Sequence, residues 1–312
     1  MTLYASMTSS KVEWVERCCP LCGPGAAARV FAESNIDLSR LDQFAFASRK
    51  LPEYMHPRLC ECTHCHLLYG NPVLSQESIS AGYNEAAFDS GMEAEQASRT
   101  YQKLIERILP LLPDRDAALD IGTGDGVFLE RLMESGFSRV RGVEPSSAPI
   151  AAAKPHIRGL IQNGLFDPGA FEPASLSLIT CFQTMEHVWD PLGVCRGAHR
   201  LLKKGGALVV VVHNRQAMSA RVLGRKSPIF DIEHLQLFSI PSSRRLFELA
   251  GFSGVQAKPI WNRYPLHYWI KLFPFPPGAK RAAISLVKKV PFLKVPIPVP
   301  AGNLVVWGFR DE

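Results

Sequence analysis

Two pairs of cysteines near the start of the chain have the spacing of zinc ligands. Cys19 and Cys22 lie in "CCPLCG", and Cys62 and Cys65 lie in "CECTHCHLLYGNP". A C-x-x-C knuckle points two thiolates at one ion, and two knuckles together supply the tetrahedral sulfur set of a structural zinc site. We therefore predict one structural zinc ion bound by these four cysteines, with no open position for a substrate.

The residue after each knuckle affects how the backbone turns around the sulfurs. Gly23 follows the first knuckle, where a positive φ lets backbone N–H groups face sulfur, whereas His66 occupies the same place in the second. Other residues could replace one of the four ligands: Cys18, Cys60, His64 and His66. Cys181 and Cys195 lie in apolar segments and are expected to be inert. Unpaired buried cysteines and a redox pair are the alternatives to a metal site.

A second group of chemically informative residues lies in "LDIGTGDGVFLERL", residues 119–132. Gly122, Gly124 and Gly126 are spaced G-x-G-x-G, and valine stands where a dinucleotide fingerprint has its third glycine. Asp120 and Asp125 would repel a pyrophosphate, but they would attract a ligand with an ammonium group and no phosphate. S-adenosylmethionine is such a ligand, and we predict that the turn binds it.

Further residues extend this predicted cofactor site. Glu144 ends the next predicted strand and is placed to accept hydrogen bonds from both ribose hydroxyls. Asp167, in "NGLFDPG", could accept the adenine amino group with Phe166 beside the ring, although the same residues also favour a simple turn. The predicted cofactor-binding residues are Asp120, Gly122, Thr123, Gly124, Gly126, Glu144, Phe166, Asp167 and Gln183.

The catalytic candidates follow later strands, because chemistry gathers at the carboxyl ends of parallel strands. They are Glu186, His187, His213, His234 and Tyr264. His234, in "IFDIEHLQLFS", is the leading general base, because it follows a segment composed like a mobile cover and its ordinary pKa near 6.5 suits proton transfer at neutral pH. The alternative is that His234 only fixes its loop through a backbone hydrogen bond. The acceptor atom, oxygen, nitrogen or carbon, stays open.

Alternating strands and helices must position these residues. Apolar patterns predict strands at residues 117–121, 140–144, 159–162, 176–182, 207–214, 254–261 and 303–310. Helices are predicted at residues 97–112, 127–136, 146–154, 190–206 and 242–252, with Asp190 capping the fourth and Lys203, Lys204 and Gly205 closing it. The alternation indicates an α/β fold, a doubly wound, Rossmann-like sheet.

At this point the chain resembles the class I S-adenosylmethionine-dependent methyltransferases, through "LDIGTGDG", "GVEPS", "MEHVWDPL" and "LLKKGGALVVVVHN". Through "CPLCG", "LLYGNP", "EHLQLFS" and "GNLVVWGFR" it also resembles a bacterial branch with an N-terminal zinc-binding segment. The resemblance implies that the last strand inserts antiparallel beside residues 254–261. It also implies a role in sugar, polysaccharide or secondary-metabolite pathways.

Two departures from related families limit what the resemblance implies. Sugar C-methyltransferases with a similar N-terminal architecture are typically longer, with an extra C-terminal domain. Related quinone O-methyltransferases have Glu where Gln183 stands, in a stretch implicated in divalent-metal binding, so the resemblance does not imply that metal here.

Length, composition and charge set the organisation. The 312 residues, 46% of them hydrophobic, predict an N-terminal zinc-binding module at 1–75 and a methyltransferase domain at 76–312, with a basic, proline-rich excursion at 261–301. The polar start and the lack of a long apolar run predict a cytoplasmic protein. The net charge of +6 does not indicate nucleic-acid binding. Residues 271–294 hold six basic residues and no acid, which fits peripheral membrane contact or, alternatively, a solvated helix face.

The expected function is methyl transfer from S-adenosylmethionine to a small-molecule acceptor, with a sugar or glycan intermediate as the leading class. The alternatives are an RNA methyltransferase with a zinc module, a quinone or lipid O-methyltransferase, and a non-catalytic zinc-binding interaction protein. The chain lacks the N-P-P-Y-like and T-C-P motifs of RNA methyltransferases. The acids and glycines of residues 120–126, with Glu144, argue against a non-catalytic protein.

Overall fold

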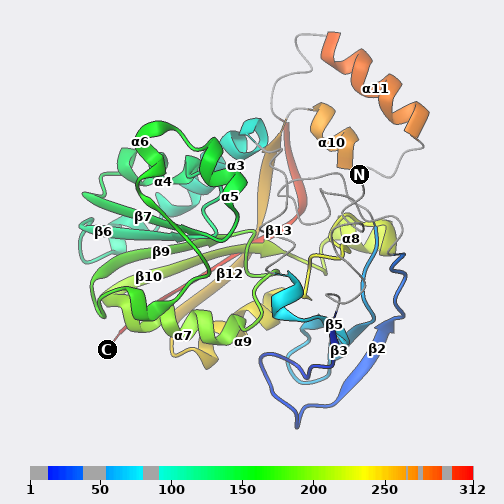
Figure 1. Cartoon of the computed structure of the whole chain (residues 1–312), viewed down its shortest axis with the longest axis horizontal. Coiled ribbons are helices and arrows are strands. Elements are labelled where there is room, and N and C mark those ends of the chain that lie inside the picture. The colour runs from blue at the N-terminus through cyan, green and yellow to red at the C-terminus, as the bar shows by residue number, and fades with distance from the viewer. Residues whose placement is uncertain are drawn as a thin grey trace.

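A mostly parallel sheet forms the centre of the chain (Figure 1). The computed structural model describes residues 13–37, 54–79, 91–264, 266–272, 277–289 and 297–311. The sheet order is β12 (Ser253–Tyr264), β13 (Ile297–Phe309), β10 (Leu202–His213), β9 (Leu176–Phe182), β6 (Ala117–Ile121), β7 (Arg139–Glu144) and β8 (Ile161–Asn163). β13 runs antiparallel to both of its neighbours, whereas the pairs from β10 to β8 are parallel. The expected Rossmann-like sheet with an antiparallel last strand is confirmed.

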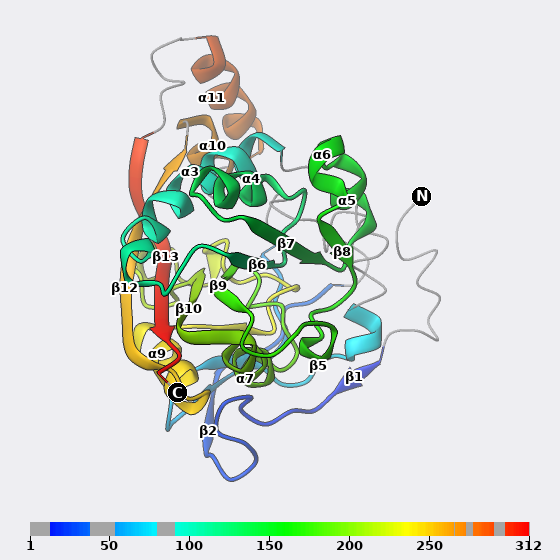
Figure 2. The same cartoon turned by 90° about the vertical axis from the view of Figure 1, so that its left-hand side faces the viewer.

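Helices cover both faces of this sheet (Figure 2). α3 (Gly91–Ile105) and α4 (Val127–Glu134) lie over one face, and α7 (Pro191–Leu201) and α9 (Ile240–Leu249) lie over the other. The side chains of β10 alternate between the two faces of the sheet. Val209 and Val211 pack with α3 and α4, and Val210 and Val212 pack on the opposite side. The continuous apolar run of β10 thus reflects burial from both sides.

Shorter elements complete this region. They are η2 (Leu109–Leu111), α5 (Ser147–Ala152), α6 (Pro155–Arg158) and η3 (Pro168–Ala170). After β10 the chain forms α8 (Met218–Leu223) and η4 (Gly224–Lys226) before it enters the segment that contains His234. The sequence did not indicate α8 or η4.

The start of α7 agrees with the sequence analysis, but its end does not. Asp190 caps the helix, accepting a 2.9 Å hydrogen bond from the N–H of Gly193. The prediction that Lys203 and Lys204 close the helix is wrong, because both lie in β10. The preceding residue, Leu202, is extended, fully buried and paired with β9, so the strand starts where a helix end was expected. The ammonium of Lys203 instead lies 2.8 and 3.1 Å from Asp114 and Asp116.

The N-terminal part forms its own sheets beside the central one. β2 (Ala28–Ala32), β3 (Leu59–Cys62) and β4 (Leu68–Gly70) pair antiparallel, and β11 (Gln236–Leu237) joins β4 as the fourth strand. β1 (Trp14–Val15) pairs with β5 (Val73–Leu74). The N-terminal sheet therefore includes a strand from far along the chain, and a domain boundary at residue 75 remains a prediction.

The last two strands extend beyond the body of the sheet. Their pairing continues to Tyr264 and Ile297, so the strands run into both ends of the proposed excursion at 261–301. Between them lie α10 (Leu266–Leu272) and α11 (Pro277–Lys289), which stand out from the sheet in Figure 1. Within the described ranges, no helix has both the length and the apolar character needed to span a membrane.

Candidate functional site

The glycine turn after β6 is held against the neighbouring strand. The backbone N–H groups of Gly122 and Thr123 both donate to the carbonyl of Val143, at 2.8 and 3.1 Å. Gly122, Gly124 and Gly126 have φ values of +74°, +60° and +73°, which glycine adopts without the steric cost of a Cβ. The turn therefore needs glycine at all three of these positions.

The surroundings of these glycines differ in a way that points to a ligand. A Cβ at Gly122 would lie 2.2 Å from the Thr184 hydroxyl oxygen, and one at Gly126 would lie 2.4 Å from a methyl carbon of Ile157. At Gly124, no described atom outside its chain neighbours comes within 4 Å of that position. Gly124 thus faces open space, where a ligand can approach the backbone.

Two buried carboxylates lie at this edge of the sheet. Asp120 is 3% exposed and accepts a 2.6 Å hydrogen bond from the Thr180 hydroxyl, and burial raises its pKa to about 7. Glu144 accepts hydrogen bonds of 2.9 Å from the backbone N–H groups of Gly124 and Ser146, and burial also raises its pKa. A cationic ligand beside these two acids would favour their ionised forms.

Gln183 directly follows β9 at the same edge of the sheet. Its φ is +53°, its backbone N–H donates to the Val211 carbonyl at 2.8 Å, and its side-chain Nε2 is buried with no hydrogen-bond partner among the described residues. A buried amide donor of this kind is satisfied when a ligand supplies an acceptor. The open space at Gly124, the two acids and this donor fit the chemistry of S-adenosylmethionine.

Phe166 and Asp167 follow β8, as the sequence predicted. Asp167 is exposed and caps η3, accepting a 2.8 Å hydrogen bond from the N–H of Gly169. Phe166 is half-buried, with its ring centroid 6.3 Å from that of Phe171. Asp167 therefore forms a turn, the alternative role that the sequence allowed, and contact of Phe166 or Asp167 with adenine remains a prediction.

Three of the catalytic candidates form one cluster of histidine rings. The ring centroid of His234 lies 4.9 Å from that of His187 and 5.1 Å from that of His213. His187 follows β9, His213 ends β10, and His234 precedes β11, so three separate segments meet here. The spacing of these residues in the chain does not show that they meet.

Each ring is oriented through its Nδ1 atom. The Nδ1 of His234 lies 2.8 Å from the Ile229 carbonyl oxygen, and the Nδ1 of His187 lies 3.1 Å from the Glu233 carbonyl oxygen. Because a carbonyl only accepts, Nδ1 carries the proton in both rings, and in the neutral ring Nε2 carries the lone pair. This is the tautomer in which Nε2 acts as a base.

Glu186 contacts the histidine cluster through the backbone of His213. Its side chain is fully buried, one carboxylate oxygen accepts a 2.5 Å hydrogen bond from the backbone N–H of His213, and burial raises its pKa. Its position suits holding the end of β10 in place. Tyr264 ends β12, and its side chain lies outside the described part of the chain.

Two further residues belong to this cluster, Glu233 and Asn303, and neither was predicted from the sequence. Glu233 brings a carboxylate oxygen within 4.8 Å of ring nitrogens of His187 and His234. Asn303 in β13 places its Oδ1 2.8 Å from the Nδ1 of His213. Glu233 directly precedes His234, which was a usable signal, whereas Asn303 reaches His213 only through the antiparallel pairing of β10 and β13.

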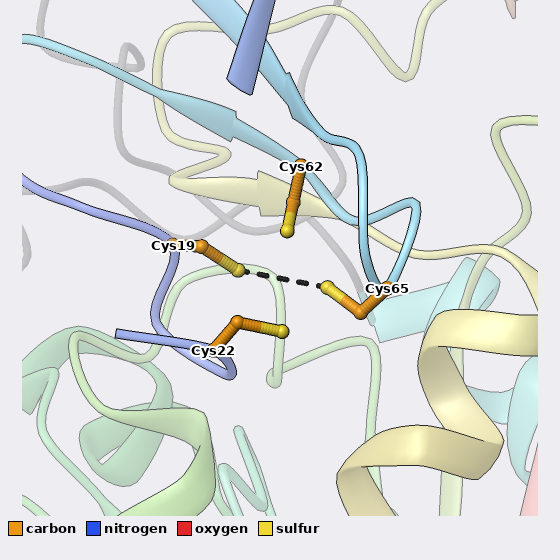
Figure 3. A group of neighbouring side chains, drawn as sticks. All are labelled: Cys19, Cys22, Cys62 and Cys65. Carbon is orange, nitrogen blue, oxygen red and sulfur yellow. Dashed lines mark hydrogen bonds between the residues drawn. The ribbon is translucent and has the colours of Figure 1, made fainter. Parts of the chain in front are cut away.

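The four predicted zinc ligands also come together (Figure 3). The sulfurs of Cys19, Cys22, Cys62 and Cys65 all lie within 4.8 Å of one another, and those of Cys19 and Cys65 are 3.6 Å apart. Four thiolates about 2.3 Å from one zinc ion would be about 3.8 Å apart. The alternatives Cys18, Cys60, His64 and His66 do not belong to this group of ligand atoms.

The two knuckles have the same backbone form. The N–H of Gly23 donates to the Cys19 carbonyl at 2.9 Å, and the N–H of His66 donates to the Cys62 carbonyl at 3.0 Å. Both turns end on a positive φ, +74° for Gly23 and +58° for His66. His66 thus takes the conformation expected for glycine, and the cluster fits a structural zinc ion.

Comparisons with known proteins agree with this geometry. Residues 94–257, just over half of the chain, match the Methyltransf_23 family, described as a methyltransferase domain. A ubiquinone biosynthesis O-methyltransferase of Pseudomonas aeruginosa is 35% identical over 106 residues, which cover 31% of this chain and 44% of that protein. A homologue of the same name from Vibrio parahaemolyticus is 31% identical over 107 residues, covering 32% and 45%. Each match thus spans less than half of the relative.

A solved structure shows the same fold at low sequence identity. Phosphoethanolamine N-methyltransferase 2 of Haemonchus contortus, in complex with S-adenosyl-L-methionine, superposes with a TM-score of 0.50. It is 14% identical, and the alignment covers 78% of this chain and 63% of that one.

Proposed function

This chain belongs to the Methyltransf_23 family of methyltransferase domains, and we propose that it transfers a methyl group from S-adenosylmethionine to a small-molecule acceptor. The observation that carries the proposal is the turn at Gly124, which opens toward a ligand beside the buried carboxylates of Asp120 and Glu144. When bound, the cofactor supplies a methyl group on a positively charged sulfur. The residues of the chain bind and orient this group for in-line attack, and such alignment accounts for much of the rate of a displacement.

The histidine cluster forms the acceptor side in this proposal. His234 holds its Nδ1 proton toward the Ile229 carbonyl, so Nε2 takes the proton of an acceptor hydroxyl. His187 and His213 lie beside it and Glu186 supports the strand that ends at His213. A sugar or glycan hydroxyl is the leading acceptor class, which rests on the resemblance to the sugar-pathway branch and on this base.

A quinone or lipid acceptor is the second candidate. The curated relatives in the comparisons are named ubiquinone biosynthesis O-methyltransferases, which favours it. Gln183, which replaces the glutamate of those quinone enzymes, makes a metal-assisted version of that reaction less suitable here. RNA as an acceptor receives no support from the site. Peripheral membrane contact through residues 271–294 stays a prediction, because residues 273–276 and 290–294 of that segment lie outside the described part of the chain.

The cysteine cluster completes the proposal as a structural zinc site. Cys19, Cys22, Cys62 and Cys65 would occupy all four positions around the ion. A closed four-sulfur site stabilises a fold and leaves no position for substrate.

Incubation with methyl-labelled S-adenosylmethionine tests the acceptor class. Separate reactions contain sugar nucleotides, glycans, quinones or RNA as the acceptor pool. We expect label in the sugar-nucleotide or glycan pool. Label confined to quinones would establish the second candidate, and label in RNA, or in none of the pools, would overturn the proposal.

A further inference from the structure

The cysteine module, defined here as residues 13–37 and 54–79, is bonded directly to the segments that carry the histidine cluster. We propose that this module holds the acceptor-side histidines in register, and that Gln236 and Arg215 are the positioning residues that make the link. The inference rests on the proposed function insofar as the histidines serve the acceptor. The link itself concerns only contacts within the chain.

The first link is the short strand β11. Gln236 and Leu237 pair with Tyr69 and Leu68 of β4, and the Leu235 carbonyl accepts a 2.9 Å hydrogen bond from Gly70. The N–H of Leu235 in turn donates to the carbonyl of Glu186 at 2.9 Å. The residues directly after His234 are therefore bonded on one side to the module and on the other to the loop of His187.

The side chain of Gln236 strengthens this connection. Its Nε2 donates to the carbonyls of Met185 and Val188, both at 2.7 Å, and the side chain is fully buried. These two carbonyls bracket Glu186 and His187. One residue thus fixes the His187 loop, follows His234 closely in the chain, and forms part of the sheet of the module.

The second link runs from the end of β10. The Arg215 guanidinium donates to the carbonyl of His66, through Nε at 3.1 Å and Nη2 at 2.9 Å, and also pairs with Glu61. His66 directly follows Cys65, and Glu61 directly precedes Cys62 in the chain. Arg215 thus contacts the second cysteine knuckle while its own segment continues directly from His213.

Both links are buried, which makes them sensitive to structural changes in the cysteine module. The side chains of Arg215 and Glu61 are 9% and 7% exposed, so the pair is protected from water. Cys19, Cys62 and Cys65 share one continuous apolar core with Val210 and Val212 of β10. Packed cores respond to a local change by discrete rearrangement, because they contain few voids that could absorb it. A disturbed knuckle would therefore shift the segments that carry the histidines.

Two substitutions break the links while leaving the cysteines in place. Gln236→Met keeps the length of the side chain but removes both of its donated hydrogen bonds. Arg215→Gln removes the positive charge that pairs with Glu61. Matched controls make the same changes at exposed sites. Gln256→Met alters an exposed residue of β12. Arg29→Gln alters the other ion-pair partner of Glu61, and the side chain of Arg29 is 73% exposed.

Nitrogen NMR of ¹⁵N-histidine-labelled protein reads the cluster without any acceptor. We expect Gln236→Met to shift the ring signals of His187 and His234, and Arg215→Gln to shift those of His213. Both controls should keep the parent signals. The dissociation constant for S-adenosylmethionine should stay within about twofold in all four variants, because the cofactor turn is held separately by β7.

Turnover gives the second measurement once an acceptor is known. We expect kcat to fall by about 10- to 100-fold in the two link variants, with the KM for S-adenosylmethionine unchanged, because small misplacements of catalytic groups are costly. Unshifted histidine signals in both link variants would overturn the proposal. A loss of S-adenosylmethionine binding as large as the loss of kcat would also overturn it, because general unfolding would then explain both effects without any displaced histidine. Shifted signals without methyl transfer to any acceptor would instead refute the proposed function and leave the link standing.

Discussion

The Glu144 carboxylate accepts a 2.9 Å hydrogen bond from the backbone N–H of Gly124, at the one turn glycine with open space above it. The carboxylate therefore fixes the turn and lies where the cofactor would contact it. We predict that Glu144→Ala weakens S-adenosylmethionine binding by about 1 to 3 kcal/mol, the range for lost hydrogen bonds to a charged group. Calorimetry measures the affinity, with the exposed Glu106→Ala as control. Unchanged affinity, or preferential binding of NADH, would contradict the cofactor assignment.

A pair of glycine substitutions separates folding from cofactor binding. Gly122→Ala would place a methyl group 2.2 Å from the Thr184 hydroxyl oxygen, so we predict loss of folded protein. Gly124→Ala meets open space, and its positive φ costs about 1 to 2 kcal/mol of stability. It should therefore fold but bind S-adenosylmethionine poorly, because the methyl group occupies space left for the ligand. Thermal unfolding and calorimetry measure both effects. Normal cofactor affinity in Gly124→Ala would show that the ligand lies elsewhere.

Asp120 should make the stability of the ligand-free protein depend on pH. Its pKa is about 7 in the folded chain, well above the usual value of 3.8, because the side chain is buried. The folded state therefore binds the proton more tightly than the unfolded state. The stabilisation is complete below about pH 4 and is lost as the pH rises through 7.

The slope from this one group is at most about 1.4 kcal/mol per pH unit. Asp120→Asn keeps an acceptor for the Thr180 hydroxyl but does not titrate, so we expect it to lose less free energy of unfolding between pH 5 and 7.5. Urea unfolding at several pH values compares the two proteins. Equal slopes would mean that Asp120 does not hold a proton in the folded chain.

Much of the cofactor side follows from local sequence. The glycines at 122, 124 and 126 and the acid that ends β7 lie within one strand-turn-helix-strand unit, and such units have well-known spacing. The acceptor side depends on contacts between distant segments. β11 has only two residues, Gln236 and Leu237, and pairs with β4 near the other end of the chain, so no periodic pattern reveals it.

The C-terminal end of α7 is a second feature that contacts between distant segments determine. Two lysines and a glycine after an amphipathic helix are typical of a C-terminus. Pairing of the buried Leu202 with Leu176 of β9 overrides that local preference, and Lys203 forms its ion pairs from a strand. Tertiary packing therefore decided a boundary that propensity alone placed wrongly.

Zinc content tests the cysteine cluster directly. We predict one zinc ion per chain, and its loss in Cys62→Ser, because the serine hydroxyl is a much weaker ligand than a thiolate. Cys60→Ser is the matched control, since Cys60 is also buried in β3 but lies outside the group of four sulfurs. Elemental analysis of anaerobically purified protein measures both variants. A parent protein without zinc, or a full zinc complement in Cys62→Ser, would refute the site.

The hydrogen bond between His234 and the Ile229 carbonyl suits both a general base and a purely structural residue, so the role of His234 needs a test that separates the two. We expect His234→Ala to lower turnover by about 10² to 10⁴ while leaving S-adenosylmethionine affinity intact. His156→Ala, at an exposed histidine of α6, should leave turnover unchanged.

His234→Asn distinguishes the two roles. The asparagine amide can still donate to the Ile229 carbonyl, but it has no basic nitrogen at the position of Nε2. If His234 is the base, turnover falls as far in His234→Asn as in His234→Ala. If asparagine restores turnover, His234 only fixes its loop, and the base must be sought at His187 or His213, whose rings lie within 5.1 Å of its own.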